Sequence, residues 1–296
     1  MNKVMFHCDW GSSSADLLNT YKLHTPNESG IWKNVQGTSD MSEADYHVVM
    51  DGGVPDVPLS KVLYFQREEP EIKEPKLDWP DDLFFQGTFT DRKHYFIPTW
   101  RIIKSYDFLK NLKYDRNAKK HMLSSITSGK VSATGHKFRV GFLMNLVEQT
   151  KNIHVFGRYG IEKYGNISSC YKGTLSNVTH GDGIPCKFDG LNPYHYTITF
   201  ENSSCYNCVS EKAVDALISW SMPIYWGCPN ISDYLPEGSY HHITDPTDPA
   251  SVDRVLEIIK NPPSDENIKA MTEARELILD KYNLWAQINT IITEAK

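Results

Sequence analysis

The sequence lacks long hydrophobic runs, which excludes proteins that cross a membrane as helices. Although 40% of its 296 residues are hydrophobic, the apolar stretches are only as long as β-strands, far short of the roughly 20 residues that a membrane-spanning helix needs. The first residues, MNKVMFHCDWG, pass directly into a strand-like run without the apolar core of a signal peptide. We therefore expect a soluble, cytoplasmic protein with no membrane span.

Basic charge is also scarce. Lysine and arginine number 31 against 37 aspartate and glutamate residues, for a formal net charge of −6. A general nucleic-acid binder usually carries a concentrated basic face and a high isoelectric point. We expect no nucleic-acid partner, and any polyanionic ligand has to be bound by a local group of cations.

Motifs for metals and for covalent catalysis are missing as well. Of six cysteines only Cys205 and Cys208 form a C-x-x-C pair, and no second pair completes a zinc site. No D-x-D motif stands in a suitable loop, and there is no P-loop, G-x-S-x-G elbow or H-E-x-x-H helix. We expect packed, reduced thiols, with no metal and no cofactor.

What the chain does contain is an alternation of apolar strands and amphipathic helices, which predicts an α/β fold with parallel sheets covered on both faces. We expect two α/β domains, at residues 1–105 and 106–275. The segment at 276–296 is expected to continue a long or kinked amphipathic helix. Ligands of open α/β sheets bind at the carboxyl ends of the strands, so the chemistry is expected on strand-to-helix loops.

One such loop is TFENSSCYNCVSEKAVDALISW, which ends in a helix start. Ser210 is a good N-cap, and the free N–H groups of the following turn form an anion site that the charge of Lys212 would strengthen. Glu211 cannot bind phosphate, so we assign it to a hydroxyl donor such as a ribose diol. The competing interpretation is that Glu211 only complements the helix dipole and Lys212 is solvated.

Two further segments carry candidate site residues. Arg139 follows the Ser/Thr/Gly-rich stretch SATGHK near a predicted helix start, where a guanidinium could clamp a diphosphate; the alternative is a helix-surface arginine. Glu68 and Glu69 follow an apolar strand in KVLYFQREEPEI, where a carboxylate could act as a general base. A solvated loop acid is the alternative for both.

Taken together, these motifs resemble the α-1,3/1,4-fucosyltransferase family. The stretch TFENSSCYNCVSEKAVDALISWSMPIYWGCPNISDYLPEGSYHHITD is similar to that family's signature of a strand ending in F-E-N, a T/S-E-K helix start and a P-I/V-x-x-G strand. The segment IHVFGRYG resembles the family's strand ending in G-R/K-x-G, and REEP resembles its E-S-P region. Cys208 stands where the family usually carries an aromatic residue.

The resemblance implies a GT-B architecture, in which an N-terminal Rossmann-like acceptor domain (1–105) and a C-terminal nucleotide-sugar-binding domain (106–275), also Rossmann-like, face a cleft. A C-terminal helix (276–296) can return to the first domain. The resemblance also implies an inverting, metal-independent glycosyltransferase that moves L-fucose from GDP-fucose onto a glycan hydroxyl. It implies roles for the following residues: Arg139 and Lys212 on the diphosphate, Glu211 on the ribose, Glu201, Asn202, Ser210 and Arg158 in donor binding, and Glu69, or failing it Glu68, as the base.

Two other functions stay open from the sequence. A glycosyltransferase of the same architecture could use another donor, such as UDP-xylose or a UDP-hexose, because phosphate and ribose contacts specify neither base nor sugar. A non-catalytic sugar or nucleotide-sugar binding module is the second alternative. The expected partners of the enzyme are a nucleotide-sugar donor and an oligosaccharide or glycoprotein glycan as acceptor.

Overall fold

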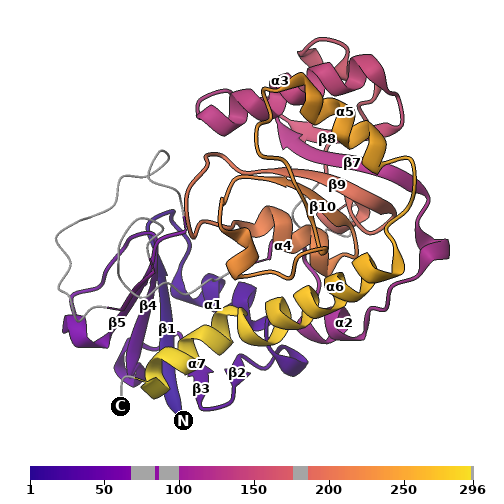
Figure 1. The fold of residues 1–296 in the computed structure, drawn as a ribbon. Helices are drawn as coiled ribbons and strands as arrows, with labels where there is room; N and C mark the ends of the chain where they lie inside the picture. Colours follow the sequence, from indigo (N-terminus) through magenta and orange to yellow (C-terminus); the bar gives the residue numbers. More distant parts are fainter. Residues whose placement is uncertain (68–83, 87–99, 176–185, 295–296) are drawn as a thin grey trace. The chain divides into compact units, whose positions relative to one another are not determined.

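A computed structural model describes residues 1–67, 84–86, 100–175 and 186–294. The chain forms two compact units (Figure 1). The first contains Met1–Thr99, Lys104–Leu112 and Ile278–Lys296, and the second contains Trp100–Ile103 and Lys113–Leu277. The chain therefore passes between the units four times, and its last segment belongs to the first unit.

The first unit is built on a six-stranded sheet in the order β2-β3-β1-β4-β5-β6. Only β2 is antiparallel, to β3; the other neighbouring strands run parallel. The strands are β1 (Asn2–Cys8), β2 (Ile31–Trp32), β3 (Val35–Gly37), β4 (Tyr46–Met50), β5 (Val62–Phe65) and β6 (Phe84–Gln86). The helices are α1 (Ser14–Lys22), α2 (Tyr106–Asn111) and α7 (Leu284–Glu294), with short 3₁₀ turns at Pro26–Glu28, Met41–Glu43 and Leu59–Lys61.

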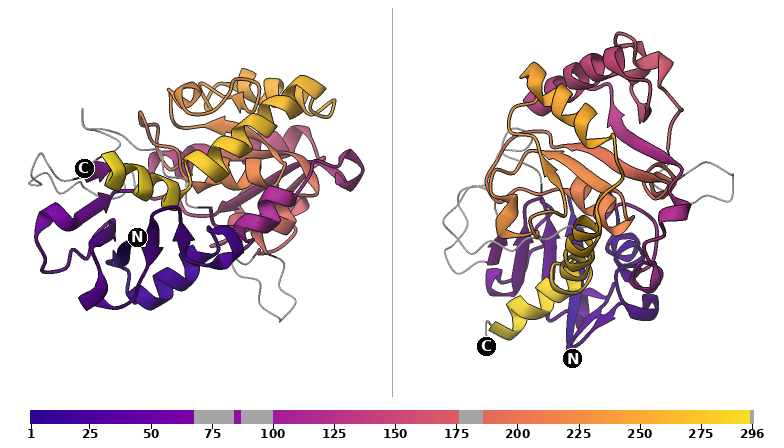
Figure 2. Two further views of the ribbon diagram at one scale, coloured as in Figure 1. Left: turned by 90° about the horizontal axis from the view of Figure 1, so that it is seen from below. Right: turned by 45° about the vertical axis from the view of Figure 1, so that its right-hand side comes forward.

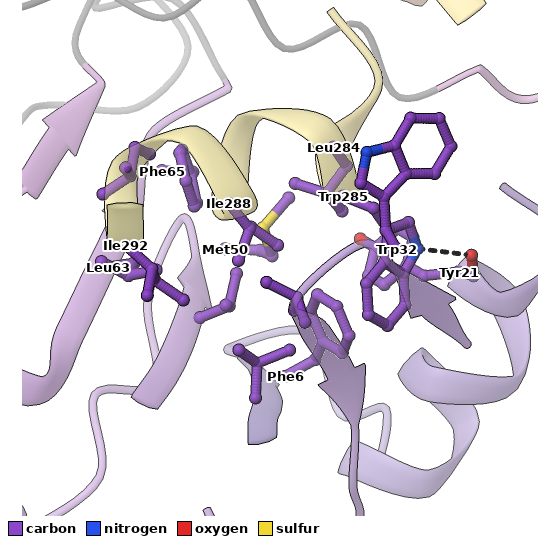
Figure 3. Close-up of a cluster of buried hydrophobic side chains, with 14 of the residues drawn as sticks. Phe6, Tyr21, Trp32, Met50, Leu63, Phe65, Leu284, Trp285, Ile288 and Ile292 are labelled. Carbon is purple, nitrogen blue, oxygen red and sulfur yellow. Dashed lines mark hydrogen bonds between the residues drawn. The ribbon is translucent and has the colours of Figure 1, made fainter. Parts of the chain in front are cut away.

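The core of this unit joins the two ends of the chain. Side chains of α1 and α7 pack on one face of the sheet (Figure 3). Trp285 is fully buried, its ring lies edge-on 5.3 Å from Phe6, and its indole Nε1–H donates to the carbonyl oxygen of Tyr21 at 2.9 Å. The Asn283 amide donates to the carbonyl oxygen of His24 at 2.8 Å. The C-terminal segment is thus part of the first unit's core.

Trp285 provides a test of this packing. We expect Trp285→Phe to lower the free energy of unfolding by about 1–3 kcal/mol, because it removes the indole donor to the Tyr21 carbonyl, which keeps the His24 backbone N–H, and removes ring volume. Urea unfolding measures the change. Phe108→Leu on the exposed side of α2 is the control and should stay within about 0.5 kcal/mol of wild type; equal effects of the two substitutions would contradict the packing described.

The second unit is built on a five-stranded, fully parallel sheet in the order β11-β10-β9-β7-β8. Helices α3 and α5 pack together on one face, and α4 and α6 on the other (Figures 1 and 2). The strands are β7 (His121–Ser128), β8 (Ile153–Arg158), β9 (Tyr194–Phe200), β10 (Met222–Trp226) and β11 (His241–His242). The helices are α3 (Thr134–Gln149), α4 (Glu211–Ile218), α5 (Pro249–Ile258) and α6 (Asp265–Glu276), with 3₁₀ turns at Arg116–Ala118, Ile161–Lys163, Ile167–Ser169, Lys187–Gly190 and Ile231–Asp233.

Both sheets reverse their strand order beside their first strand. In the second unit β8 lies on one side of β7 and β9 on the other, so the reversal falls between β7 and β9. In the first unit it falls between β1 and β4. Such a switch point, at the carboxyl ends of the strands, is where open α/β sheets bind their ligands.

The predicted alternation of strands and helices is confirmed, and the last segment is a kinked helix. Helix α6 is followed by a π-helical turn at Leu277–Lys281 and then by α7. Within the described residues, no helix is both long and apolar enough to cross a membrane.

Candidate active site

The candidate site of the second unit is the loop after β9. Its central residue is Glu201, whose side chain is 1% exposed and accepts bonds from four groups. Oε1 accepts from the Ser210 backbone N–H at 2.9 Å and from the Tyr225 hydroxyl at 3.3 Å. Oε2 accepts from the Ser210 hydroxyl and from Lys212 Nζ at 3.1 Å. The buried Glu201 carboxylate thus joins the first residue after β9 to the start of α4.

Helix α4 starts as the sequence predicted. Ser210 is its N-cap, and the Ser210 hydroxyl accepts from the Lys212 backbone N–H at 3.3 Å. Lys212 Nζ lies 3.0 Å from the same hydroxyl, so the lysine side chain folds back over the helix start toward Glu201. Its ammonium group is partly buried, with a side-chain exposure of 20%. Lys212 is therefore held at the helix start, and it is not a freely solvated surface lysine.

The neighbouring acids of α4 belong to a second ionic group. Asp215 is fully buried and pairs with Lys187, and its Oδ1 accepts from the Arg101 backbone N–H at 2.7 Å. Burial raises the pKa of Asp215. For Glu211, burial acts to raise the pKa, but Lys212, Lys187 and Arg101 together bring it well below its usual range. Glu211 is thus ionised and surrounded by cations.

Helix α3 brings a second helix start to the same loop. Its Gly135 N–H donates to the Asn202 carbonyl oxygen at 2.8 Å. A side chain at Gly135 would come within 2.3 Å of the Glu201 carbonyl oxygen, so only glycine permits this close approach. Arg139, 5% exposed, donates from Nη1 to the Phe200 carbonyl oxygen at 3.1 Å.

The predicted position of Arg139 within its helix was wrong by almost one turn. The apolar pattern suggested a helix that begins near Lys137, but α3 begins at Thr134, and Arg139 therefore lies in the second turn. Two contacts lie in the added turn: Gly135 donates to the β9 loop, and His136 accepts from the Ala133 backbone N–H. Arg139 is buried at the carboxyl end of β9, which rules out the helix-surface alternative.

His136 is a site residue that the sequence analysis missed. Its Nδ1 accepts from the Ala133 backbone N–H at 3.2 Å, which places the proton of the neutral ring on Nε2, and Nε2 donates to Asn202 Oδ1 at 3.1 Å. The histidine thereby fixes the orientation of the Asn202 amide. Its one sequence signal was its place beside a glycine at a helix start, in SATGH.

Several cations lie near His136. Burial lowers the pKa of His136, and the charges of Arg139, Lys212 and Lys130 lower it further. These three cations come from α3, from α4 and from the loop after β7, elements that begin or end at the switch point between β7 and β9. Lys130 Nζ lies 4.8 Å from the centre of the Tyr159 ring, and Lys212 shares its charge with Glu201. An anion at this switch point would thus meet Arg139, Lys212 and two helix starts.

The remaining predicted residues fall elsewhere. Arg158 ends β8, two strands from β9; its side chain is exposed, and Nη2 donates to the Leu175 carbonyl oxygen at 3.4 Å. Glu68 and Glu69 lie outside the described residues. None of the six cysteines, all of which lie within the described residues, forms a disulfide; Cys208 is buried and Cys205 partly so. Within residues 1–67, 100–175 and 186–294, no group of three or more His, Cys, Asp or Glu side chains is placed to hold a metal ion.

A parallel sheet with an anion-suited switch point, bracketed by two helix starts, is the arrangement of nucleotide-binding α/β enzymes. The family model of glycosyltransferase family 10 (fucosyltransferase), C-terminal part, matches residues 117–266. That range contains the whole cluster from Lys130 to Lys212. The chain belongs to this family.

Curated relatives match over short segments. The chain is 38% identical over 66 residues to an α-(1,3)-fucosyltransferase of Helicobacter pylori, which covers 22% of this chain and 14% of that protein. It is 35% identical over 63 residues to a putative fucosyltransferase-like protein of Arabidopsis thaliana, 21% of this chain and 12% of that protein. The chain therefore aligns with less than a sixth of the length of either relative.

Solved structures match over nearly the whole chain. A β-glucosyltransferase that modifies DNA is 12% identical, with a TM-score of 0.50 over 99% of both chains. An α1,3-fucosyltransferase solved with GDP is 15% identical, with a TM-score of 0.48 over 96% of this chain and 92% of the other. At such identities the likeness concerns the fold, which is that of the GT-B glycosyltransferases.

Proposed function

We propose that this chain is a glycosyltransferase that transfers L-fucose from GDP-fucose to a hydroxyl group of a glycan, with inversion at the anomeric carbon. The observation that carries the proposal is the placement of two cations beside the switch point of the second unit: Arg139 at the carboxyl end of β9 and Lys212 at the start of α4. Membership of the fucosyltransferase family supports the choice of donor. The substrates of the relatives are properties of those proteins, and the donor of this chain is part of the proposal.

The cluster would act on the leaving group. In the proposed reaction the acceptor oxygen attacks the anomeric carbon, its proton passes to a carboxylate, and the bond from the anomeric carbon to the diphosphate oxygen breaks. Negative charge then grows on the departing GDP, where Arg139, Lys212 and the N–H groups at the two helix starts are already in place. In this proposal these groups, and no metal ion, balance that charge.

The base and the ribose contact stay predictions. Glu69, or failing it Glu68, is proposed to take the acceptor proton. Glu211 is proposed to bind the ribose, which its ionised state favours because a carboxylate accepts hydrogen bonds from two hydroxyl groups. Asn202, oriented by His136, is proposed to face the donor.

The donor is tested by thermal stabilisation. We expect GDP to raise the melting temperature of the protein, and to do so by more than UDP at equal concentration, because ligands that bind only the native state stabilise it by mass action. Guanosine, which lacks the phosphates, is the control and should have little effect. EDTA should leave the GDP effect unchanged. Stronger stabilisation by UDP would favour the UDP-sugar alternative, and no stabilisation by either nucleotide would contradict the proposed site.

Turnover separates the enzyme from a binding module. Release of GDP from GDP-fucose, by transfer or by slow hydrolysis, that is lost in Glu69→Gln or Glu68→Gln would support catalysis. Nucleotide binding without any turnover, in the presence of a broad panel of glycans, would favour the non-catalytic module.

A further inference from the structure

At its own switch point the first unit carries one exposed tryptophan among charged and polar residues. The proposed donor site does not use this group of residues. Strand β1 is followed by Asp9 and Trp10, β4 by Asp51, and β5 by Gln66 and Arg67. These strands are neighbours and run parallel, so the residues that follow them meet at one edge of the sheet. The indole of Trp10 is 44% exposed there, although large aromatic side chains are usually buried.

The inner layer of this cluster is a buried ion pair. Asp51 is 3% exposed and has a positive φ of 61°, a left-handed backbone conformation that is uncommon outside glycine. Its Oδ1 accepts from the Arg67 backbone N–H at 2.5 Å, and its Oδ2 accepts from Arg67 Nε at 3.0 Å and Nη2 at 2.7 Å. Three contacts thus fix both the main chain and the guanidinium of Arg67.

Arg67 in turn holds Trp10. Its guanidinium carbon lies 4.7 Å from the centre of the indole ring, in a cation–π contact, and only 15% of the Arg67 side chain is exposed. The guanidinium covers one face of the ring, so the exposed surface of the indole lies on the remainder. A flat apolar surface is therefore presented to solvent on a rigid support.

A carboxylate lies at the same edge of the sheet as Trp10. Asp9 precedes Trp10 and is exposed, and a side chain built at Gly52 would come within 2.5 Å of Asp9 Oδ2. The Asp9 carboxylate is thus placed against the end of β4. An acceptor of hydrogen bonds at the same sheet edge as an exposed aromatic ring matches a pyranose, which has an apolar C–H face and hydroxyl donors around its rim.

We propose that Trp10 and Asp9, supported by Arg67 and Asp51, form a carbohydrate-binding platform that holds a pyranose ring of the acceptor glycan. The proposal rests on the proposed glycosyl transfer and names the part of that reaction's second substrate that the first unit binds. The ring of the sugar stacks on the exposed indole, and its hydroxyl groups donate to Asp9. Because Asp51 and Arg67 already fix the indole, binding costs little side-chain entropy.

The test uses lactose and chitobiose as probes, with saturation-transfer NMR on the whole chain. Wild-type protein should transfer saturation to at least one of the two disaccharides, which shows that the disaccharide binds. Trp10→Ala should weaken that binding by about threefold to tenfold, the range expected for loss of an aromatic stacking contact. Trp10→Phe should retain part of the binding. Phe108→Ala is the matched control, because Phe108 is 42% exposed in the same unit with Lys104 Nζ 5.0 Å from its ring centre.

Stabilisation by GDP is measured on the same variants and should be unchanged in Trp10→Ala. The GDP measurement separates the two proposals. Failure of GDP to stabilise wild type contradicts the donor site, whereas disaccharide binding tests the platform whether or not GDP binds. Where transfer is detected, Trp10→Ala should raise KM for the acceptor and leave donor hydrolysis unaltered. Absence of disaccharide binding by wild type, or equal binding by wild type and Trp10→Ala, would overturn the platform.

Discussion

Lys212→Ala is expected to reduce turnover of the donor by about 10²–10³-fold, the usual cost of removing one preorganised group that stabilises developing negative charge. Lys212 Nζ is held at the start of α4 by the Ser210 hydroxyl at 3.0 Å and by Glu201 at 3.1 Å, so its charge is in position before the donor binds. Because charge on the diphosphate grows as the sugar leaves, kcat should fall more than donor affinity. GDP release from GDP-fucose, measured at saturating and at low donor concentration, separates the two.

Lys137→Ala is the matched control. Lys137 is an exposed lysine of α3 directly after His136, so its removal changes the net charge of the protein by the same amount. Turnover of Lys137→Ala should stay close to wild type if the loss of turnover in Lys212→Ala depends on where the charge lies. Turnover of Lys212→Ala within about threefold of wild type would exclude Lys212 from this role, since one such donor is worth far more in comparable sites.

The order of strands and helices could be predicted because apolar periodicity is a local property. The strand over YHYTITF and the helix after Ser210 follow directly from it, and the N-cap preference of serine marked the start of α4. The start of α3 could not be predicted in the same way. One contact at that start, of Gly135 with Asn202, joins residues 67 positions apart, and the local contact of His136 with Ala133 has no strong sequence preference to mark it.

The sequence predicted several residues of the candidate site but not the contacts between them. Lys212 was identified from its place in the first turn of a capped helix, but its pairing with Glu201 joins residues that are separated by a polar loop. His136 gave no distinct signal, because a histidine at a helix start is common and its Asn202 contact is made across the fold. Likewise, the exposure of Trp10 depends on Arg67 and Asp51 beneath it, which the sequence places far apart.

Glu201→Gln is expected to lower the free energy of unfolding by about 3–5 kcal/mol, the cost of leaving one member of a buried ion pair without its partner. Four donors point at the Glu201 carboxylate, and a glutamine amide would turn two of its own hydrogens toward donors that need an acceptor. Urea unfolding followed by tryptophan fluorescence and by circular dichroism measures the loss. The control is Glu257→Gln, because Glu257 pairs with Lys260 on the exposed surface of the same unit and should change stability by at most about 1 kcal/mol.

The same substitution distinguishes two roles for Glu201. If the Glu201 carboxylate positions Ser210 and Lys212 and does not contact the donor, Glu201→Gln should lose stability and GDP binding together, because both residues lose the group that positions them. Unchanged stability with GDP binding abolished would instead indicate direct contact of Glu201 with the donor, as the family resemblance implies. With its side chain 1% exposed and both oxygens already bonded to the protein, Glu201 is better placed for the first role. A stability change below about 1 kcal/mol combined with normal GDP binding would contradict both.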